Sequence, residues 1–253
     1  MPCWASSLGD CSEKLTREHY VSKGLFGRDV INVQGFHWCK DKMVTIGLGS
    51  LTAKILCERH NHELSRIDDA AVRAYNVFRE FNRVTNIRRS KPTNKKREVK
   101  AYRIDGPRLE RWLLKTLINL TFDRGISIGL AAPTEGGLDS DLVAIAFGRK
   151  PFLRRMGLYF AIHTGLRLDM TEDLAFRPLT RKVENYIGGM LCSFYGFRLL
   201  LFLAPDGPPA RLTNCGIDTE DWGDCDLNFH NERIDEYDEK QQKSQVIHID
   251  WYG

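Results

Sequence analysis

Cysteine and histidine side chains are concentrated near the start of this chain. The sequence has seven cysteines, an odd number that argues against a complete disulfide framework. Four cysteines and four histidines fall in the first quarter: Cys3, Cys11, Cys39, Cys57, His19, His37, His60 and His62. No charged and apolar segment typical of a secretory signal precedes them, so we expect a cytoplasmic protein. In that compartment, cysteines beside histidines are more typical of metal ligands than of disulfide bridges.

One cysteine–histidine pair has the spacing of a metal site. Cys57 and His60 are separated by two residues, as in a zinc knuckle. Such a pair supplies two of the four ligands that a tetrahedral structural zinc needs. The sequence therefore predicts that Cys57 and His60 form half of a zinc site.

The local pattern around this pair predicts a short order of elements. Residues 14–22 alternate and carry β-branched and aromatic side chains, which indicates a strand, and residues 50–57 indicate a second one. The glycine-rich stretch 24–49 between them predicts a long loop. From about residue 64 a helix is expected, because apolar side chains recur at helical spacing: Ile67, Ala71, Ala74, Phe78 and Phe81.

A carboxylate and an imidazole are neighbours on the first of these strands. Adjacent strand residues point to opposite faces, so Glu18 can face a metal while His19 faces a water molecule, or the reverse with a local twist. Asn61 falls in the first helical turn, where its amide oxygen can reach toward the same place. An imidazole is a suitable base near neutral pH. Carboxylate and amide oxygens are the ligands that a hard cation prefers.

The segments L-T-R-E-H and I-L-C-E-R-H-N, which contain these residues, resemble motifs of the HNH endonuclease family. The resemblance covers about residues 3–82 and is to the subgroup with zinc knuckles. It implies a ββα-metal fold, in which a two-stranded hairpin and a helix surround a metal. It further implies metal-dependent hydrolysis of phosphodiester bonds in DNA, with His19 as general base and with Glu18 and Asn61 binding one Mg²⁺ or Mn²⁺.

The sequence departs from the family pattern at three places, one of which is the long loop between the two halves of the motif. The family's first knuckle is C-x2-C, whereas Cys3 and Cys11 are separated by seven residues. The resemblance implies that these two complete the zinc site with Cys57 and His60, although Cys39 or His37 could take one place. The family's middle asparagine aligns near Thr52 and Ser50. A non-catalytic, zinc-stabilised nucleic-acid-binding or regulatory module and an RNA-directed nuclease are therefore alternatives.

Charge is distributed unevenly along the chain. Residues 1–126 hold 24 Lys and Arg against 14 Asp and Glu, whereas residues 127–253 hold 13 against 19. Residues 79–103 alone hold ten basic and two acidic side chains. We expect this stretch to contact phosphates of DNA, with RNA as an alternative, because such contacts do not depend on the base sequence. The candidate contact residues are Arg83, Arg88, Arg89, Lys91, Lys95, Lys96 and Arg97.

These observations together predict an α+β protein in three parts. They are an HNH-like module at 1–85, a basic linker at 86–106 and a C-terminal α+β domain of unassigned role at 107–253. The last part begins with a helix at Pro107 and continues with strands of an antiparallel sheet, including a hairpin with its turn at 195–196. The acidic stretch 217–243 is expected to be an exposed loop. The longest apolar run, 199–204, is far short of the roughly 20 residues of a membrane span, so no membrane partner is expected.

Overall fold

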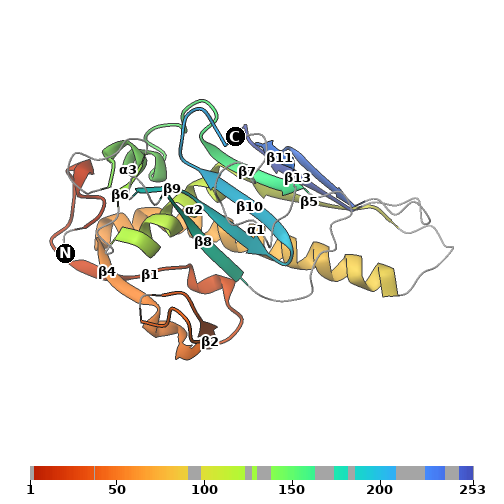
Figure 1. Ribbon diagram of the computed structural model, residues 1–253, viewed down its shortest axis with the longest axis horizontal. Helices are drawn as coiled ribbons and strands as arrows, with labels where there is room; N and C mark the ends of the chain where they lie inside the picture. Colours follow the sequence, from red (N-terminus) through yellow and green to blue (C-terminus); the bar gives the residue numbers. More distant parts are fainter. Residues whose placement is uncertain are drawn as a thin grey trace.

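The structure is a mixed α+β arrangement, which confirms the predicted fold class (Figure 1). It is a computed structural model. It describes residues 3–36, 38–90, 98–122, 127–129, 138–162, 174–181, 186–208, 226–236 and 245–252. The helices among these residues are α1 (Glu58–Ser90), α2 (Gly106–Thr121) and α3 (Ser140–Ala146), with 3₁₀ turns η1 (Ser6–Leu8), η2 (Lys23–Leu25) and η3 (Leu48–Ser50).

The strands of the described residues form four sheets. Two of the sheets are antiparallel strand pairs in the N-terminal part, β1 with β4 and β2 with β3, and the other two lie in the rest of the chain. The strands are β1 (Leu15–His19), β2 (Val30–Val33), β3 (Val44–Gly47), β4 (Thr52–Cys57), β5 (Lys100–Asp105), β6 (Ser127–Ile128), β7 (Gly157–Ile162), β8 (Leu174–Arg181), β9 (Tyr186–Phe194), β10 (Phe197–Phe202), β11 (Asp226–Phe229), β12 (Arg233–Glu236) and β13 (Gln245–Asp250).

Strands β1 and β4 form an antiparallel pair that leads directly into α1. In their register Glu18 lies opposite Ala53 and His19 lies opposite Thr52, with an irregularity between Thr16 and Glu18. The predicted order of two strands followed by a helix is confirmed. The helix starts at Glu58, about six residues earlier than expected, and its first backbone N–H is tied to the segment before β1.

The loop predicted between these strands contains further structure, so that prediction was incomplete. Strands β2 and β3 pair as a second antiparallel hairpin within residues 24–49. Their side chains alternate between exposed and half-buried positions, but the intervening glycines obscure this period in the sequence. This hairpin lies beyond β1 and β4, at the edge of the molecule in Figure 1.

The C-terminal part is built on a six-stranded sheet with the order β11-β7-β10-β9-β6, and β8 pairs with β9. The predicted hairpin of β9 and β10 is confirmed, with Phe194 opposite Phe197. The sheets are not purely antiparallel, which corrects the predicted antiparallel sheet. β6 runs parallel to β9, and β5 runs parallel to β13 in a second sheet of three strands. Both parallel pairs join segments that are distant in sequence, which no local pattern indicates.

Two segments differ from the loops that composition predicts. The segment 86–106, predicted as a basic linker, is divided between the last turns of α1, residues 91–97 outside the described part, and β5. The acidic stretch 217–243 contains β11 and β12, because its charged residues alternate with apolar ones that face inward, as in Asp226–Phe229. Composition therefore hid strands that the two-residue period could have revealed.

Helix α2 connects the N-terminal part to the large sheet. It is buried along most of its length, and one apolar cluster includes side chains from both ends of the chain, from Trp4 to Trp251. The indole N–H of Trp112 on α2 donates to Ser22 Oγ at 2.7 Å, just after β1. Consequently, α2 lies against the strand that carries Glu18 and His19. None of the helices in the described ranges has the length and apolar character needed to cross a membrane.

Candidate functional site

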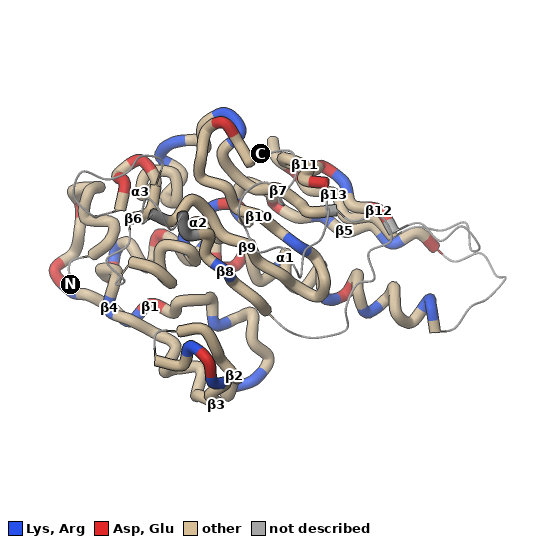
Figure 2. The backbone as a smooth tube through the Cα atoms, in the orientation of Figure 1, with Lys and Arg blue, Asp and Glu red and all other residues tan. Residues whose placement is uncertain are grey.

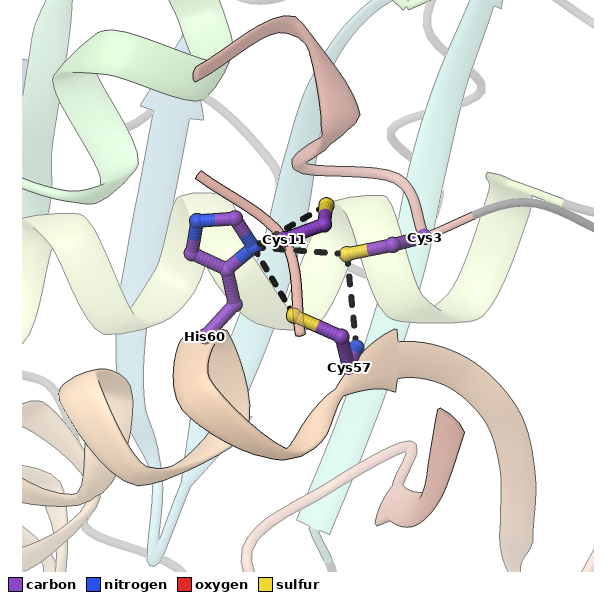
Figure 3. Close-up of side chains that lie close together, drawn as sticks. All are labelled: Cys3, Cys11, Cys57 and His60. Atoms are coloured by element: carbon purple, nitrogen blue, oxygen red, sulfur yellow. Dashed lines mark hydrogen bonds between the residues drawn. The ribbon is translucent and has the colours of Figure 1, made fainter. Parts of the chain in front are cut away.

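Four side chains converge at the junction of β4 and α1. Cys57 is the last residue of β4, His60 lies in the first turn of α1, and Cys3 and Cys11 flank η1 near the start of the chain. Their ligand atoms all lie within 4.8 Å of one another (Figure 3). His60 Nδ1 is 3.2 Å from Cys57 Sγ, 3.5 Å from Cys3 Sγ and 3.6 Å from Cys11 Sγ.

Backbone contacts bring the first of these cysteines to the junction. The N–H of Trp4 donates to the carbonyl of Ile55 at 3.0 Å, which aligns the start of the chain with β4. The N–H of Cys57 then donates to Cys3 Sγ at 3.3 Å. Cys3, Cys57 and His60 are buried, so water does not separate these groups. The cluster thus joins the start of the chain, a strand and a helix.

A carboxylate fixes the orientation of the imidazole. His60 Nε2 lies 2.8 Å from Asp10 Oδ1. Since a carboxylate only accepts, Nε2 carries the proton and Nδ1 presents its lone pair to the three sulfurs. The hydrogen bond with His60 is the main reason that the pKa of Asp10 is lowered, and Arg59 contributes through its 2.8 Å ion pair. The ring of Phe147 packs edge-on against the imidazole at 5.1 Å and shields it.

The three thiols differ in their acidity. Burial raises the pKa of Cys3. Burial is also the main reason that the pKa of Cys11 is raised to about 12, and the neighbouring Cys3 raises it further. Burial also opposes ionisation of Cys57, but hydrogen bonds from the backbone of His60 and from Ser12 outweigh it and lower its pKa to about 6. Three thiolates this close would repel one another. A bound divalent cation would remove that repulsion and allow all three to ionise.

The cluster of Cys3, Cys11, Cys57 and His60 could therefore bind a metal such as zinc. Tetrahedral bonds of about 2.3 Å to sulfur and about 2.0 Å to nitrogen would place nitrogen and sulfur roughly 3.6 Å apart. The distances from the imidazole nitrogen to Cys3 and Cys11 match that value, and the 3.2 Å distance to Cys57 is about 0.4 Å shorter. Cys39 is a buried free cysteine outside the cluster. His37, the other alternative ligand, lies outside the described residues.

His19 lies at the end of β1 with one ring nitrogen unused. Its Nε2 is buried, and no described residue forms a hydrogen bond with it. Burial lowers the pKa of the imidazole, and the charges of Lys23 and Lys115 lower it further. The neutral form, which can accept a proton, is therefore favoured. Thr52, near the family's middle position, faces His19 in the register but donates to the carbonyl of Gly49 at 3.1 Å.

Glu18 points into the protein and is paired with a cation from α2. Its Oε1 lies 2.5 Å from Lys115 Nζ and accepts from Asn119 Nδ2 at 3.4 Å. The same ammonium lies 2.7 Å from both oxygens of Asp68 on α1, which also accepts from Ser22. Burial raises the pKa of Glu18, and Lys115 opposes that rise. The three side chains are called the Glu18–Lys115–Asp68 triad below.

Asn61 contacts β1 near Glu18 without bonding to that carboxylate. Its Nδ2 donates to Thr16 Oγ1 at 3.0 Å, two residues before Glu18. Asn61 and Asp68 are seven residues apart on α1, so both lie on the helix face toward the pair of β1 and β4. Asn61 thus meets β1 at Thr16, whereas Glu18 reaches Asp68 of α1 through the ammonium of Lys115. Lys115 and Asn119 of α2 both contact Glu18, and no sequence motif indicated their presence.

The predicted nucleic-acid contacts are only partly described. Arg83, Arg88 and Arg89 lie on the last turns of α1, which extend away from the rest of the molecule (Figures 1 and 2). Arg83 forms two hydrogen bonds with Glu80 at 2.6 and 2.8 Å, and Arg88 donates to the carbonyl of Glu98. The remaining candidates lie outside the described residues: Lys91, Lys95, Lys96 and Arg97.

Comparison with known proteins finds no relative of this chain. No protein-family model, no curated protein and no solved structure matches the chain. The roles of these side chains are therefore argued from their positions and chemistry.

Proposed function

We propose that this chain is an endonuclease that hydrolyses phosphodiester bonds in DNA, with His19 as general base. The observation that carries the proposal is the buried His19 Nε2, which has no hydrogen-bond partner among the described residues. A general base needs a ring nitrogen that no protein group occupies, and the attacking water would have to enter beside this covered atom. Leaving a buried polar atom unpaired costs stability, so it calls for a functional reason.

The chemistry of the neighbouring oxygens supports a divalent ion between β1 and α1. Both contacts of the Glu18 carboxylate go to Oε1, and the amide of Asn61 uses its nitrogen. Glu18 Oε2 and Asn61 Oδ1 are thus the oxygens that would hold Mg²⁺ or Mn²⁺. When bound, this ion would stabilise the charge that builds on the phosphate. His19, on the adjacent position of β1, would take the proton from the attacking water.

We assign a structural zinc to the cluster of Cys3, Cys11, Cys57 and His60. Four protein ligands leave no open position, which is typical of structural rather than catalytic zinc. The cluster ties the start of the chain to β4 and α1, the two elements that orient β1 and carry Asn61. Short hairpins are marginal alone, so this metal would keep His19 and Asn61 in their relative positions.

A second candidate is the non-catalytic nucleic-acid-binding module, and Lys115 favours it. Its ammonium already compensates the Glu18 carboxylate at 2.5 Å, with a side chain that is 2% exposed. A metal at Glu18 would therefore have to coexist with this cation or displace it. Under this alternative, the Glu18–Lys115–Asp68 triad is a structural link that joins α2 to β1 and α1. The basic end of α1 would bind nucleic acid in either case, DNA or RNA.

Plasmid nicking by the full-length protein tests the two candidates. Supercoiled DNA is incubated with the protein and Mg²⁺, Mn²⁺ or EDTA, and the nicked and linear forms are measured. The nuclease proposal expects metal-dependent nicking that is lost in His19→Ala and kept in the control His248→Ala, whose histidine lies on β13. Retained nicking in His19→Ala would overturn the role of that base. Salt-sensitive binding without nicking would support the module instead.

A further inference from the structure

The β2–β3 hairpin, with residues 28–36 and 38–47 described, has an unusual surface. Val30, Trp38 and Met43 are 54%, 46% and 61% exposed. They are three of the seven large apolar side chains that are exposed in the described part of the chain. Such a concentration on one small element, at the edge of the molecule in Figure 1, is typical of a surface that binds a partner.

An aromatic row, formed by Tyr20, Phe36 and Trp38, extends from this surface to the end of β1. Tyr20 directly follows His19, and its ring centroid lies 5.9 Å from that of Phe36. Phe36 in turn stacks on Trp38, with centroids 5.5 Å apart and planes inclined by 20°. Phe36 covers one face of the indole, so the exposed surface of Trp38 lies on its other face and edges. The row thus begins at the residue that follows His19 in the chain and ends at the surface.

The hairpin and the elements next to it in the chain carry more exposed basic than acidic side chains. Arg28, Lys40 and Lys42 are exposed on the hairpin, where two acidic residues, Asp29 and Asp41, accompany them. Further exposed cations lie on neighbouring elements: Arg17 on β1, Lys23 on η2 and Lys54 on β4. An aromatic surface with a positive margin matches a nucleic-acid strand, because the rings stack on bases and the cations attract phosphates.

We propose that the aromatic row is a stacking site for unpaired bases of single-stranded nucleic acid, with Trp38 in direct contact. The choice of a nucleic acid rests on the proposed function. A duplex keeps its bases stacked on one another, whereas a single strand offers free base faces to a protruding indole. The row would therefore hold a single-stranded or locally opened substrate next to His19. A protein partner would need no bases, and the experiment separates the two.

Fluorescence anisotropy with the full-length protein tests the stacking site. A labelled single-stranded DNA of about 20 nucleotides, long enough for one site, is titrated in EDTA so that no cleavage occurs. Trp38→Ala is expected to weaken binding about 5- to 150-fold, the range for the loss of one base–aromatic stack. Trp38→Phe should retain most of the affinity. The control is Tyr252→Ala, which removes a 90% exposed aromatic ring elsewhere.

Three further probes make the result specific for bases. An abasic strand has the same phosphates without bases, and Trp38→Ala should bind it as well as the unmodified protein does. A duplex of the same length should bind more weakly than the single strand, and a single-stranded RNA should show the same dependence on Trp38 as the DNA. Equal affinity of Trp38→Ala for the DNA strand, or an equal loss on the abasic strand, would overturn the proposal. The proposal would also be overturned if the unmodified protein associated with itself and bound none of these strands.

The binding experiment with Trp38→Ala and the plasmid-nicking assay can fail independently of each other. Loss of single-strand binding in Trp38→Ala together with no nicking under any metal would leave the stacking site standing and reject the nuclease. Metal-dependent nicking together with unchanged binding in Trp38→Ala would support the nuclease and reject the stacking site.

Discussion

Replacing Lys115 by methionine should destabilise the protein strongly. The substitution keeps the length of an unbranched side chain but removes the ammonium that lies 2.5 Å from Glu18 and 2.7 Å from Asp68. The side chains of Lys115 and Glu18 are 2% and 7% exposed, so water cannot replace the lost partner. Leaving one member of a buried ion pair unpaired costs about 3–5 kcal/mol. For a chain of this size, that is roughly a 6–20 °C fall in Tm.

The loss should depend on pH in a defined direction. Burial already raises the pKa of Glu18, and without Lys115 it would rise further. A carboxyl whose pKa is higher in the folded than in the unfolded state binds a proton on folding, so acidification favours the folded form. The difference in unfolding free energy between Lys115→Met and the unmodified protein should therefore be largest above neutral pH. It should shrink as the pH falls and Glu18 becomes neutral.

Chemical denaturation at several pH values provides the measurement. The matched control is Lys100→Met, which removes an exposed lysine, 48% accessible, from its 3.5 Å ion pair with Glu80. Pairs of this kind contribute about 0–1 kcal/mol, so the control should change little. Similar losses in the two variants, or a loss for Lys115→Met that does not change with pH, would refute the reasoning.

The remaining predictions concern the metal cluster. Cys57→Ser and His60→Ala should each lose zinc and lower Tm more than His19→Ala does, as measured by metal analysis and thermal unfolding. Cys39→Ser should retain zinc, because Cys39 lies outside the cluster; zinc loss in that variant would contradict the ligand set. Asp10→Asn should keep the metal but hold it about 10- to 100-fold less tightly, as measured by competition with a chelator. Unchanged affinity would show that Asp10 does not orient the imidazole.

Local patterns in the sequence predicted much of the N-terminal architecture. The spacing of Cys57 and His60 and the strands around residues 15–19 and 52–57 are visible because they depend on neighbouring residues. The resemblance to a known motif then suggested Cys3 and Cys11, which the structure brings to the same place.

The parts that could not be predicted depend on contacts between distant segments. The ammonium of Lys115 meets Glu18 across 97 residues of chain, and a lysine within an apolar helix carries no sign of its partner. The parallel pairing of β5 with β13 likewise joins two ends of the C-terminal part. Strand β11 was hidden by composition, because the acidic residues of its segment outweigh the apolar residues that face inward.

We propose that one metal ion is bound by three sulfurs and one nitrogen at the junction of β4 and α1. X-ray absorption spectroscopy of the purified full-length protein measures this directly, together with its metal content. We expect one zinc per chain, with three sulfur ligands at about 2.3 Å and one nitrogen ligand at about 2.0 Å. A protein that contains no zinc, or a zinc shell of four sulfurs or of oxygens, would contradict the account.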